Sequence, residues 1–126
     1  MREEIENWWK QAKKDLEAAN NSINSGDYEW ASFQANQSAE KGLKALFLKE
    51  KRAIVPSHNL ISIGKALNLS EEIMNSLKDL NPEYILARYP DAANASPFEI
   101  YTKEKAIEKV KQAEKVIKWI EKQLEK

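Results

Sequence analysis

The sequence contains no cysteine and only one histidine, His58. Without cysteine the chain can form neither a disulfide nor a thiolate metal site, and a single imidazole cannot build a multi-histidine metal centre within one chain. These absences exclude a zinc enzyme. No metal and no other cofactor are expected.

The chain also lacks a net charge, because its 20 basic and 20 acidic residues cancel. Wrapping of a nucleic-acid backbone and adhesion to an anionic membrane both need an excess of positive charge, so any contact with RNA must be local. The N-terminal segment is charged from its second residue and has no apolar run of signal-peptide or membrane-spanning length. We therefore expect a cytoplasmic protein with no membrane contact.

Glycine is scarce, with single residues at Gly26, Gly42 and Gly64. A glycine-rich phosphate loop needs several glycines within a few residues of one another, which these positions do not provide. The sequence gives no support for paired catalytic carboxylates or for a Ser-His-Asp arrangement either. Most enzyme classes are therefore not expected.

What the sequence does have is helical periodicity from end to end, without the period-two alternation that is typical of strands. Apolar residues at helical spacing, separated by turn and capping residues, predict helices over residues 2–24, 28–51, 58–67, 70–88 and 103–125. The fourth of these helices is expected to pause at Asn81-Pro82 before it resumes. The expected fold class is all-α: an antiparallel up-and-down bundle of four to five helices, three long and two short. It should form one domain over residues 1–126.

Single residues set several of the predicted helix ends. Asp27 is placed to cap the second helix, and Ser57 is placed to cap the third, so that His58 opens that helix. Ser70 and Thr102 are placed to cap the fourth helix and the last one.

The second predicted helix has two contrasting faces. At 100° per residue, its core face gathers Ala31, Ala35, Ala39, Gly42, Leu43 and Leu46. A polar stripe on the roughly opposite face contains Gln34, Gln37, Lys41 and Lys44. Trp30 and Leu48 lie at the two ends of this polar stripe, and large apolar groups seldom bracket a fully solvated face. Either a subunit, a ligand or the next loop covers the stripe, or it is a solvated face with two incidental apolar residues.

Charged residues near this stripe allow two interpretations. Asp15 on the first helix can form a buried polar network with Glu40, Lys41 and Lys44 on the second. Alternatively, the same residues form only exposed pairs between neighbouring helical turns, each contributing a few tenths of a kcal/mol.

His58 is the first candidate for general acid–base chemistry, because histidine is the side-chain type whose unperturbed pKa lies near neutrality. Arg52 precedes it with five residues between, and a guanidinium beside an imidazole can hold a phosphodiester while the imidazole moves a proton at the 2′-hydroxyl. Pro56 interrupts the pair, so the two side chains do not share one continuous helical face. The alternative is that His58 packs over the connector or bonds a neighbouring carbonyl.

A second cluster combines the cation Arg88, the ring of Tyr89, the bend at Pro90 and the carboxylate of Asp91. A nucleotide can use all four features. In the alternative, Arg88 pairs with Asp91 or with a helix C-terminus, and Tyr89 plugs the end of the bundle. Residues 91–101, which follow this cluster, form the only long segment expected to be irregular.

Taken together, several groups of residues resemble the HEPN family of small helical domains found in higher eukaryotes and prokaryotes: Ala12 with Asp15-Leu16, the run QSAEKGLK at 37–44, His58-Asn59-Leu60, ARYPD at 87–91, and Ala106 with Ala113. The resemblance implies an antiparallel bundle of four or five helices and a homodimer. It also implies a minimal nucleotidyltransferase as partner, in a toxin–antitoxin-like system linked to nucleotide or RNA chemistry. Some family members are metal-independent ribonucleases with an Arg-x4–6-His motif, whose spacing Arg52 and His58 match.

Three functional hypotheses follow. In the first, the chain is a binding module whose nucleotide- or partner-docking residues are Gln37, Lys41, Lys44, Arg88, Tyr89 and Asp91. In the second, it is a metal-independent ribonuclease toxin in which Arg52 binds the phosphate and His58 acts as the base. In the third, it is a structural dimerisation domain without a ligand.

Overall fold

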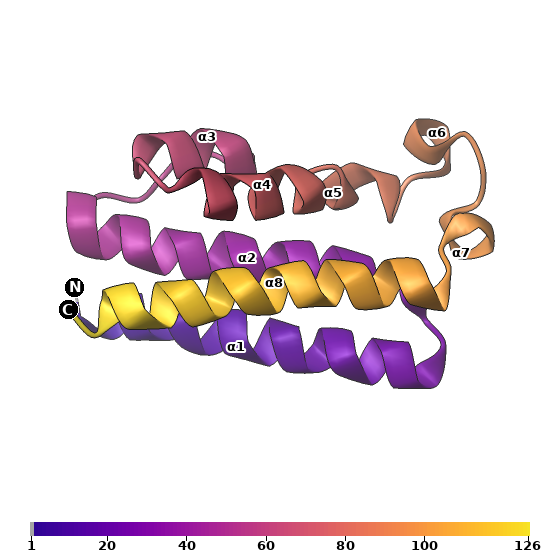
Figure 1. The fold of residues 1–126 in the computed structure, drawn as a ribbon, viewed down its shortest axis with the longest axis horizontal. Helices are drawn as coiled ribbons and strands as arrows, with labels where there is room; N and C mark the ends of the chain where they lie inside the picture. Colours follow the sequence, from indigo (N-terminus) through magenta and orange to yellow (C-terminus); the bar gives the residue numbers. More distant parts are fainter. Residues whose placement is uncertain (1) are drawn as a thin grey trace.

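The computed structural model describes residues 2–126, which contain eight helices and no strand. Three of the helices are long: α1 (Arg2–Ser25), α2 (Tyr28–Lys51) and α8 (Lys103–Leu124). Figure 1 shows these three helices side by side, with the start of α1 and the end of α8 at the same end of the bundle. The all-α antiparallel bundle predicted from the sequence is confirmed.

A tight turn at Gly26 reverses the chain between α1 and α2. Gly26 has a φ of +83°, a left-handed value that glycine adopts without steric cost. The amides of Gly26 and Asp27 donate to the carbonyls of Ile23 at 3.1 Å and Ser22 at 2.8 Å, which closes the end of α1. The Asp27 side chain does not cap α2 as predicted, because its carboxylate accepts a hydrogen bond from Ser25 Oγ at 2.8 Å instead.

Two shorter helices, α3 (Leu60–Ala66) and α4 (Glu71–Leu80), form a second layer over the long helices. In Figure 1 they lie along α2 on the side away from α1. Ser70 caps α4 as predicted, since its Oγ accepts from the amide of Ile73 at 3.3 Å. Thr102 caps α8 in the same way.

The prediction that Ser57 caps α3 and that His58 opens this helix is wrong. Asn59 is the cap, because its side-chain oxygen accepts from the amide of Ser62 at 3.0 Å. Ser57 Oγ accepts from the amide of Asn59 at 3.0 Å, so it stabilises the turn that precedes the helix. His58 therefore lies in the connector between α2 and α3, where its backbone is not tied into a helix.

Three single-turn helices complete the chain: α5 (Glu83–Leu86), α6 (Pro90–Ala93) and α7 (Pro97–Ile100). The prediction of an irregular segment over residues 91–101 is therefore wrong in part. Proline stands in the first turn of both α6 and α7, where its missing N–H has no helical partner to lose. Asn94, with a φ of +56°, ends α6 in a left-handed conformation.

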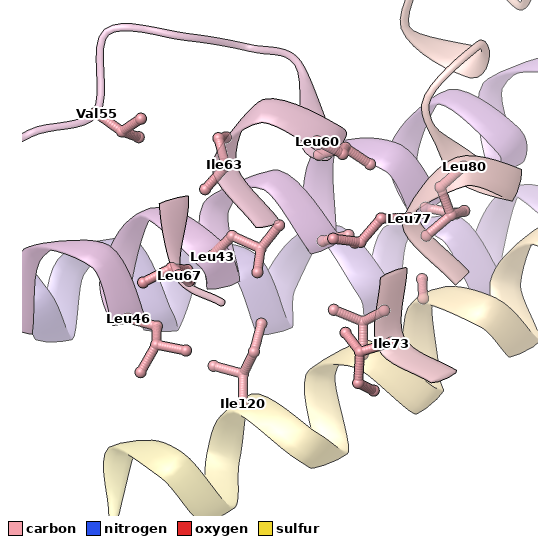
Figure 2. Packing of buried hydrophobic residues seen from close by; sticks show 14 of the residues in the cluster. Leu43, Leu46, Val55, Leu60, Ile63, Leu67, Ile73, Leu77, Leu80 and Ile120 are labelled. Carbon is pink, nitrogen blue, oxygen red and sulfur yellow. The ribbon is translucent and has the colours of Figure 1, made fainter. Parts of the chain in front are cut away.

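The core lies around α2, which contacts α1, α3, α4, α5, α7 and α8. All residues predicted for its core face are buried. Figure 2 shows Leu43 and Leu46 of α2 among side chains of α3, α4 and α8. Gly42 lets α8 come close, because a Cβ atom there would lie only 2.9 Å from Cδ1 of Ile117 and 3.0 Å from Cδ1 of Ile120.

Candidate functional site

Several of the residues singled out by the sequence meet where α2, the connector before α3, and α5 come together. The ring of His58 stacks on the ring of Tyr84, with a centroid distance of 5.5 Å and an interplanar angle of 14°. Phe33 of α2 also packs against Tyr84, with a centroid distance of 6.3 Å and an interplanar angle of 46°. We refer to the surface formed by Phe33, His58, Tyr84, Arg88 and Tyr89 as the aromatic surface.

Beneath His58 lies a buried carboxylate, Glu40, which is 2% exposed. Its Oε2 forms an ion pair with Lys44 Nζ at 2.8 Å and lies 2.7 Å from Nδ1 of His58. Its Oε1 has no hydrogen-bond partner within residues 2–126. The interpretation of these residues as a buried polar network therefore holds for Glu40 and Lys44.

The contact with Glu40 fixes the orientation of the His58 ring. With Nδ1 held against Glu40, the Nε2 edge of the ring is the edge free to meet a ligand, and within the described chain Nε2 makes no hydrogen bond. The His58 side chain is 62% exposed, so it is accessible. A cavity of about 250 Å³ lies next to it and is lined by His58, Asn59, Asn81, Pro82, Tyr84 and Ile85.

Arg88 forms the centre of the aromatic surface. Its guanidinium carbon lies 4.4 Å from the ring centroid of Phe33, 4.7 Å from that of Tyr84 and 4.9 Å from that of Tyr89. Its Nε donates to the backbone carbonyl of Tyr84 at 2.9 Å, which holds the side chain against these rings. Of the predicted alternative, the pairing of Arg88 with a helix C-terminus is present, because the Tyr84 carbonyl belongs to the single turn of α5. Tyr89 does not plug the end of the bundle, because it is 50% exposed.

The polar stripe of α2 is covered in part by α1. Lys41 Nζ pairs with Asp15 Oδ2 at 2.5 Å, and Lys44 Nζ lies 5.2 Å from the ring centroid of Trp8. Gln37 donates to its neighbour Asn36 at 3.2 Å and is partly exposed. Neither lysine is therefore a free surface cation.

Leu48 does not bracket the stripe at the surface as expected. It is 3% exposed and belongs to the core, whereas Trp30 at the other end is 48% exposed. Helical spacing places Leu48 beside the stripe, but α2 is buried on most sides near its C-terminal half, so position on the helix wheel alone does not decide exposure.

The model of the HEPN domain family matches residues 5–123 of this chain. The chain belongs to the HEPN family. No curated protein matches it significantly.

Solved structures agree with this assignment. The HEPN chain is similar to TT1696 from Thermus thermophilus, with 32% identity, a TM-score of 0.87, and coverage of 94% of this chain and 97% of that one. It is also similar to ST0689, an archaeal HEPN homologue, with 32% identity, a TM-score of 0.79, and coverage of 94% and 96%. An HEPN domain protein, tm0613 from Thermotoga maritima, has 29% identity, a TM-score of 0.77, and coverage of 95% and 98%.

Two sequence-predicted site residues of this HEPN domain stand apart from the aromatic surface. Arg52 ends α2 in a left-handed conformation with φ of +53° and is exposed, and its side chain forms no hydrogen bond or ion pair within residues 2–126. Asp91 lies exposed in α6, and in the same part of the chain it pairs neither with Arg88 nor with any other cation. The structure thus joins His58, Lys44, Arg88 and Tyr89 to one region, and it shows no bond between Arg52 and His58.

Sequence reasoning missed Phe33 and Tyr84 as members of the site. Tyr84 stands four residues before Arg88, and Phe33 stands four residues before Gln37, so helical spacing places each of them beside a residue that was recognised. Including the residue four positions before Gln37 in the stripe of α2, and the residue four positions before Arg88 in its cluster, would have found both.

Within residues 2–126 of this HEPN domain, no group of three or more His, Cys, Asp or Glu side chains is arranged to hold a metal ion. No helix in the described part of the chain combines the length and apolarity needed to cross a bilayer.

Proposed function

We propose that this HEPN domain is a binding module that takes a nucleotide or RNA at its aromatic surface. The observation that carries the proposal is the arrangement of His58, Tyr84 and Arg88, in which an exposed imidazole and a guanidinium both lie against the ring of Tyr84. Bases stack on aromatic rings and on guanidinium planes, while Arg and His donate hydrogen bonds to phosphate.

Affinity at such a site would depend on these local contacts. The chain has no net charge, so long-range attraction of phosphate contributes little. Stacking of a base on an aromatic side chain is worth about 1–3 kcal/mol, and Tyr89 and the His58 side chain, which are 50% and 62% exposed, are accessible enough to supply it. Single-stranded RNA, whose bases are free to stack, fits this surface better than a duplex.

A second candidate is a metal-independent ribonuclease that uses His58 as the base and Arg52 as the phosphate ligand. The contact of Glu40 with Nδ1 favours it, because a carboxylate on one imidazole nitrogen orients the other nitrogen for proton transfer. Arg52 would have to approach the bound phosphate from the connector or from a second subunit.

One experiment tests the binding site and separates it from catalysis. Titration of a fluorescent single-stranded RNA, and separately of ATP, should show that Arg88→Ala and His58→Ala each weaken binding about tenfold, because each removes roughly 1.4 kcal/mol of stacking and phosphate contact. Lys115→Ala is the matched control, since this cation pairs with Glu72 between α8 and α4, away from the aromatic surface. Equal affinity of wild type and Arg88→Ala for both probes would contradict the proposal.

The same RNA, incubated with protein in EDTA, tests the ribonuclease candidate. Cleavage by wild type that is lost in both Arg52→Ala and His58→Ala would establish the second candidate. Intact RNA in the wild-type reaction would refute it and leave the binding module.

We also propose that the chain acts as a homodimer and, as family membership supports, beside a minimal nucleotidyltransferase. Trp30 and Ile85 are 48% and 49% exposed and adjoin the aromatic surface. Large apolar groups gathered in this way are typical of a surface that a partner covers.

The dimer proposal predicts that light scattering gives a mass twice the 14.5 kDa of one chain. Trp30→Glu should shift the protein to a monomer, because it places a charge in the apolar part of the contact. Phe98→Glu is the control, since Phe98 is equally apolar and 67% exposed but lies on α7. A wild-type monomer, or a Trp30→Glu dimer as stable as wild type, would contradict the proposed interface.

A further inference from the structure

The turn that carries Tyr84 is too short to hold its own position. Helix α5 contains four residues, and no side chain caps its N-terminus. A single turn forms one or two hydrogen bonds and is not stable by itself. Whatever places Tyr84 and Arg88 at the aromatic surface must therefore come from contacts with the rest of the bundle.

The polar contacts of this kind are made by Glu83, the first residue of α5, which is 2% exposed. Its Oε2 accepts a hydrogen bond from the hydroxyl of Tyr101, and its Oε1 pairs with Lys109 Nζ at 3.2 Å. Tyr101 precedes α8 and Lys109 lies on it, and they are 4% and 9% exposed. Both carboxylate oxygens are thus tied to the region of α8, and none of the three residues belongs to the aromatic surface.

The end of α4, directly before α5, is anchored by the same lysine. Lys109 Nζ donates to the carbonyl of Asp79 at 2.7 Å and pairs with its carboxylate at 3.3 Å. The next carbonyl, that of Leu80, accepts from the side chain of Asn36 on α2 at 2.9 Å. These bonds satisfy carbonyls that a helix C-terminus leaves without partners, and they fix the point from which α5 starts.

Adjacent residues on a helix point about 100° apart, so a fixed Glu83 also fixes the direction of Tyr84. Arg88 then follows, held to Tyr84 through the bond from its Nε to the Tyr84 carbonyl. Burial, and after it the hydrogen bond to Glu83, raise the pKa of Tyr101 above its ordinary value, so its hydroxyl stays protonated and able to donate.

We infer that Glu83, Tyr101 and Lys109 are positioning residues that lock α5 and thereby set the stacking of Tyr84 on His58 at the aromatic surface. The part of this inference that concerns ligand affinity rests on the proposed function. The part that concerns the stacking itself does not, because it is a property of the free protein.

His58 is the only histidine of the chain, so its Cε1–H resonance is identified in a proton NMR spectrum without assignment of the rest. The ring of Tyr84 shifts this resonance while the two rings are stacked. Tyr101→Phe removes one hydroxyl and keeps the ring, and Glu83→Gln keeps the shape of the side chain. We expect the His58 resonance to move in both variants toward its position in an unstructured peptide, and RNA affinity to fall about tenfold.

Ser76→Ala is the matched control. It removes a hydrogen bond of 2.7 Å from Ser76 Oγ to Gln112 Oε1, which also joins the second layer to α8 but does not reach α5. It should lower stability while leaving the His58 resonance and the RNA affinity at wild-type values. An unchanged resonance in both Tyr101→Phe and Glu83→Gln, or an equal displacement in Ser76→Ala, would overturn the inference. Absence of RNA binding by wild type would instead refute the proposed function, and the resonance would still decide whether Glu83 positions α5.

Discussion

Glu40→Ala should lower the free energy of unfolding by about 3–5 kcal/mol, the cost typical of removing one partner from a buried ion pair. The substitution leaves Lys44, whose side chain is 9% exposed, without the carboxylate that lies 2.8 Å from its Nζ. The loss of the contact with His58 adds little, because that side chain is 62% exposed and water can replace the contact. Equilibrium unfolding in urea, followed by circular dichroism, measures the change.

Two further variants separate the charge from the packing at this position. Asp15→Ala breaks the ion pair between Asp15 and Lys41, whose side chains are 15% and 24% exposed. This substitution should lower the free energy of unfolding by about 1 kcal/mol or less. The double substitution Glu40→Leu with Lys44→Met removes both charges together and should recover most of the stability, because neither charge is then left unpaired. A double variant as unstable as Glu40→Ala would show that charge pairing is not what Glu40 contributes.

The long helices were predictable because their signals are local. The spacing of apolar residues and the sequence Asn24-Ser25-Gly26 define α1 and α2 to within a residue, and Ser70 and Thr102 cap the helices that they were expected to cap. Each of these signals depends on residues within one or two turns, so no knowledge of the tertiary structure is needed.

The start of α3 shows where local signals are not enough. Ser57 and Asn59 are both good N-cap residues, and they stand two positions apart. The choice is made by residues distant in sequence: the amide of Leu60 donates to Asn81 Oδ1 at 2.9 Å, and the Leu60 side chain is fully buried. Only the helix that begins at Leu60 satisfies both contacts, which is why His58 remains in the connector.

The site was predictable in part for the same reason. His58, Lys44 and Arg88 carry charge or an ionisable ring, so sequence alone marks them as candidates. Some of the contacts that arrange them join residues far apart in the sequence: Glu40 and His58 are 18 positions apart, and Glu83 and Lys109 are 26 positions apart. Pairs of this kind leave no periodic pattern in the sequence, so they emerge only once the helices are packed.

Leu43→Ala should be as damaging as the loss of the buried carboxylate, with a cost of about 2–5 kcal/mol in the free energy of unfolding. Leu43 is fully buried on α2, and Figure 2 shows it in the layer shared with α3, α4 and α8. Its neighbours Ile63 and Ile120 belong to different helices, each held by contacts of its own, so they cannot both move to fill the space. The cavity should therefore persist, and its cost adds to that of the lost apolar burial.

Urea unfolding again gives the measurement, with two comparisons that isolate the cause. Leu43→Met conserves volume and should cost less than about 1.5 kcal/mol. Ile54→Ala removes an aliphatic side chain of equal size that is 65% exposed in the connector, and should change stability by no more than about 0.5 kcal/mol. The denaturant dependence of unfolding should stay the same in all three, since the native state keeps its compactness. If Leu43→Ala proved as mild as Ile54→Ala, the layer between α2 and the two shorter helices would not be close-packed.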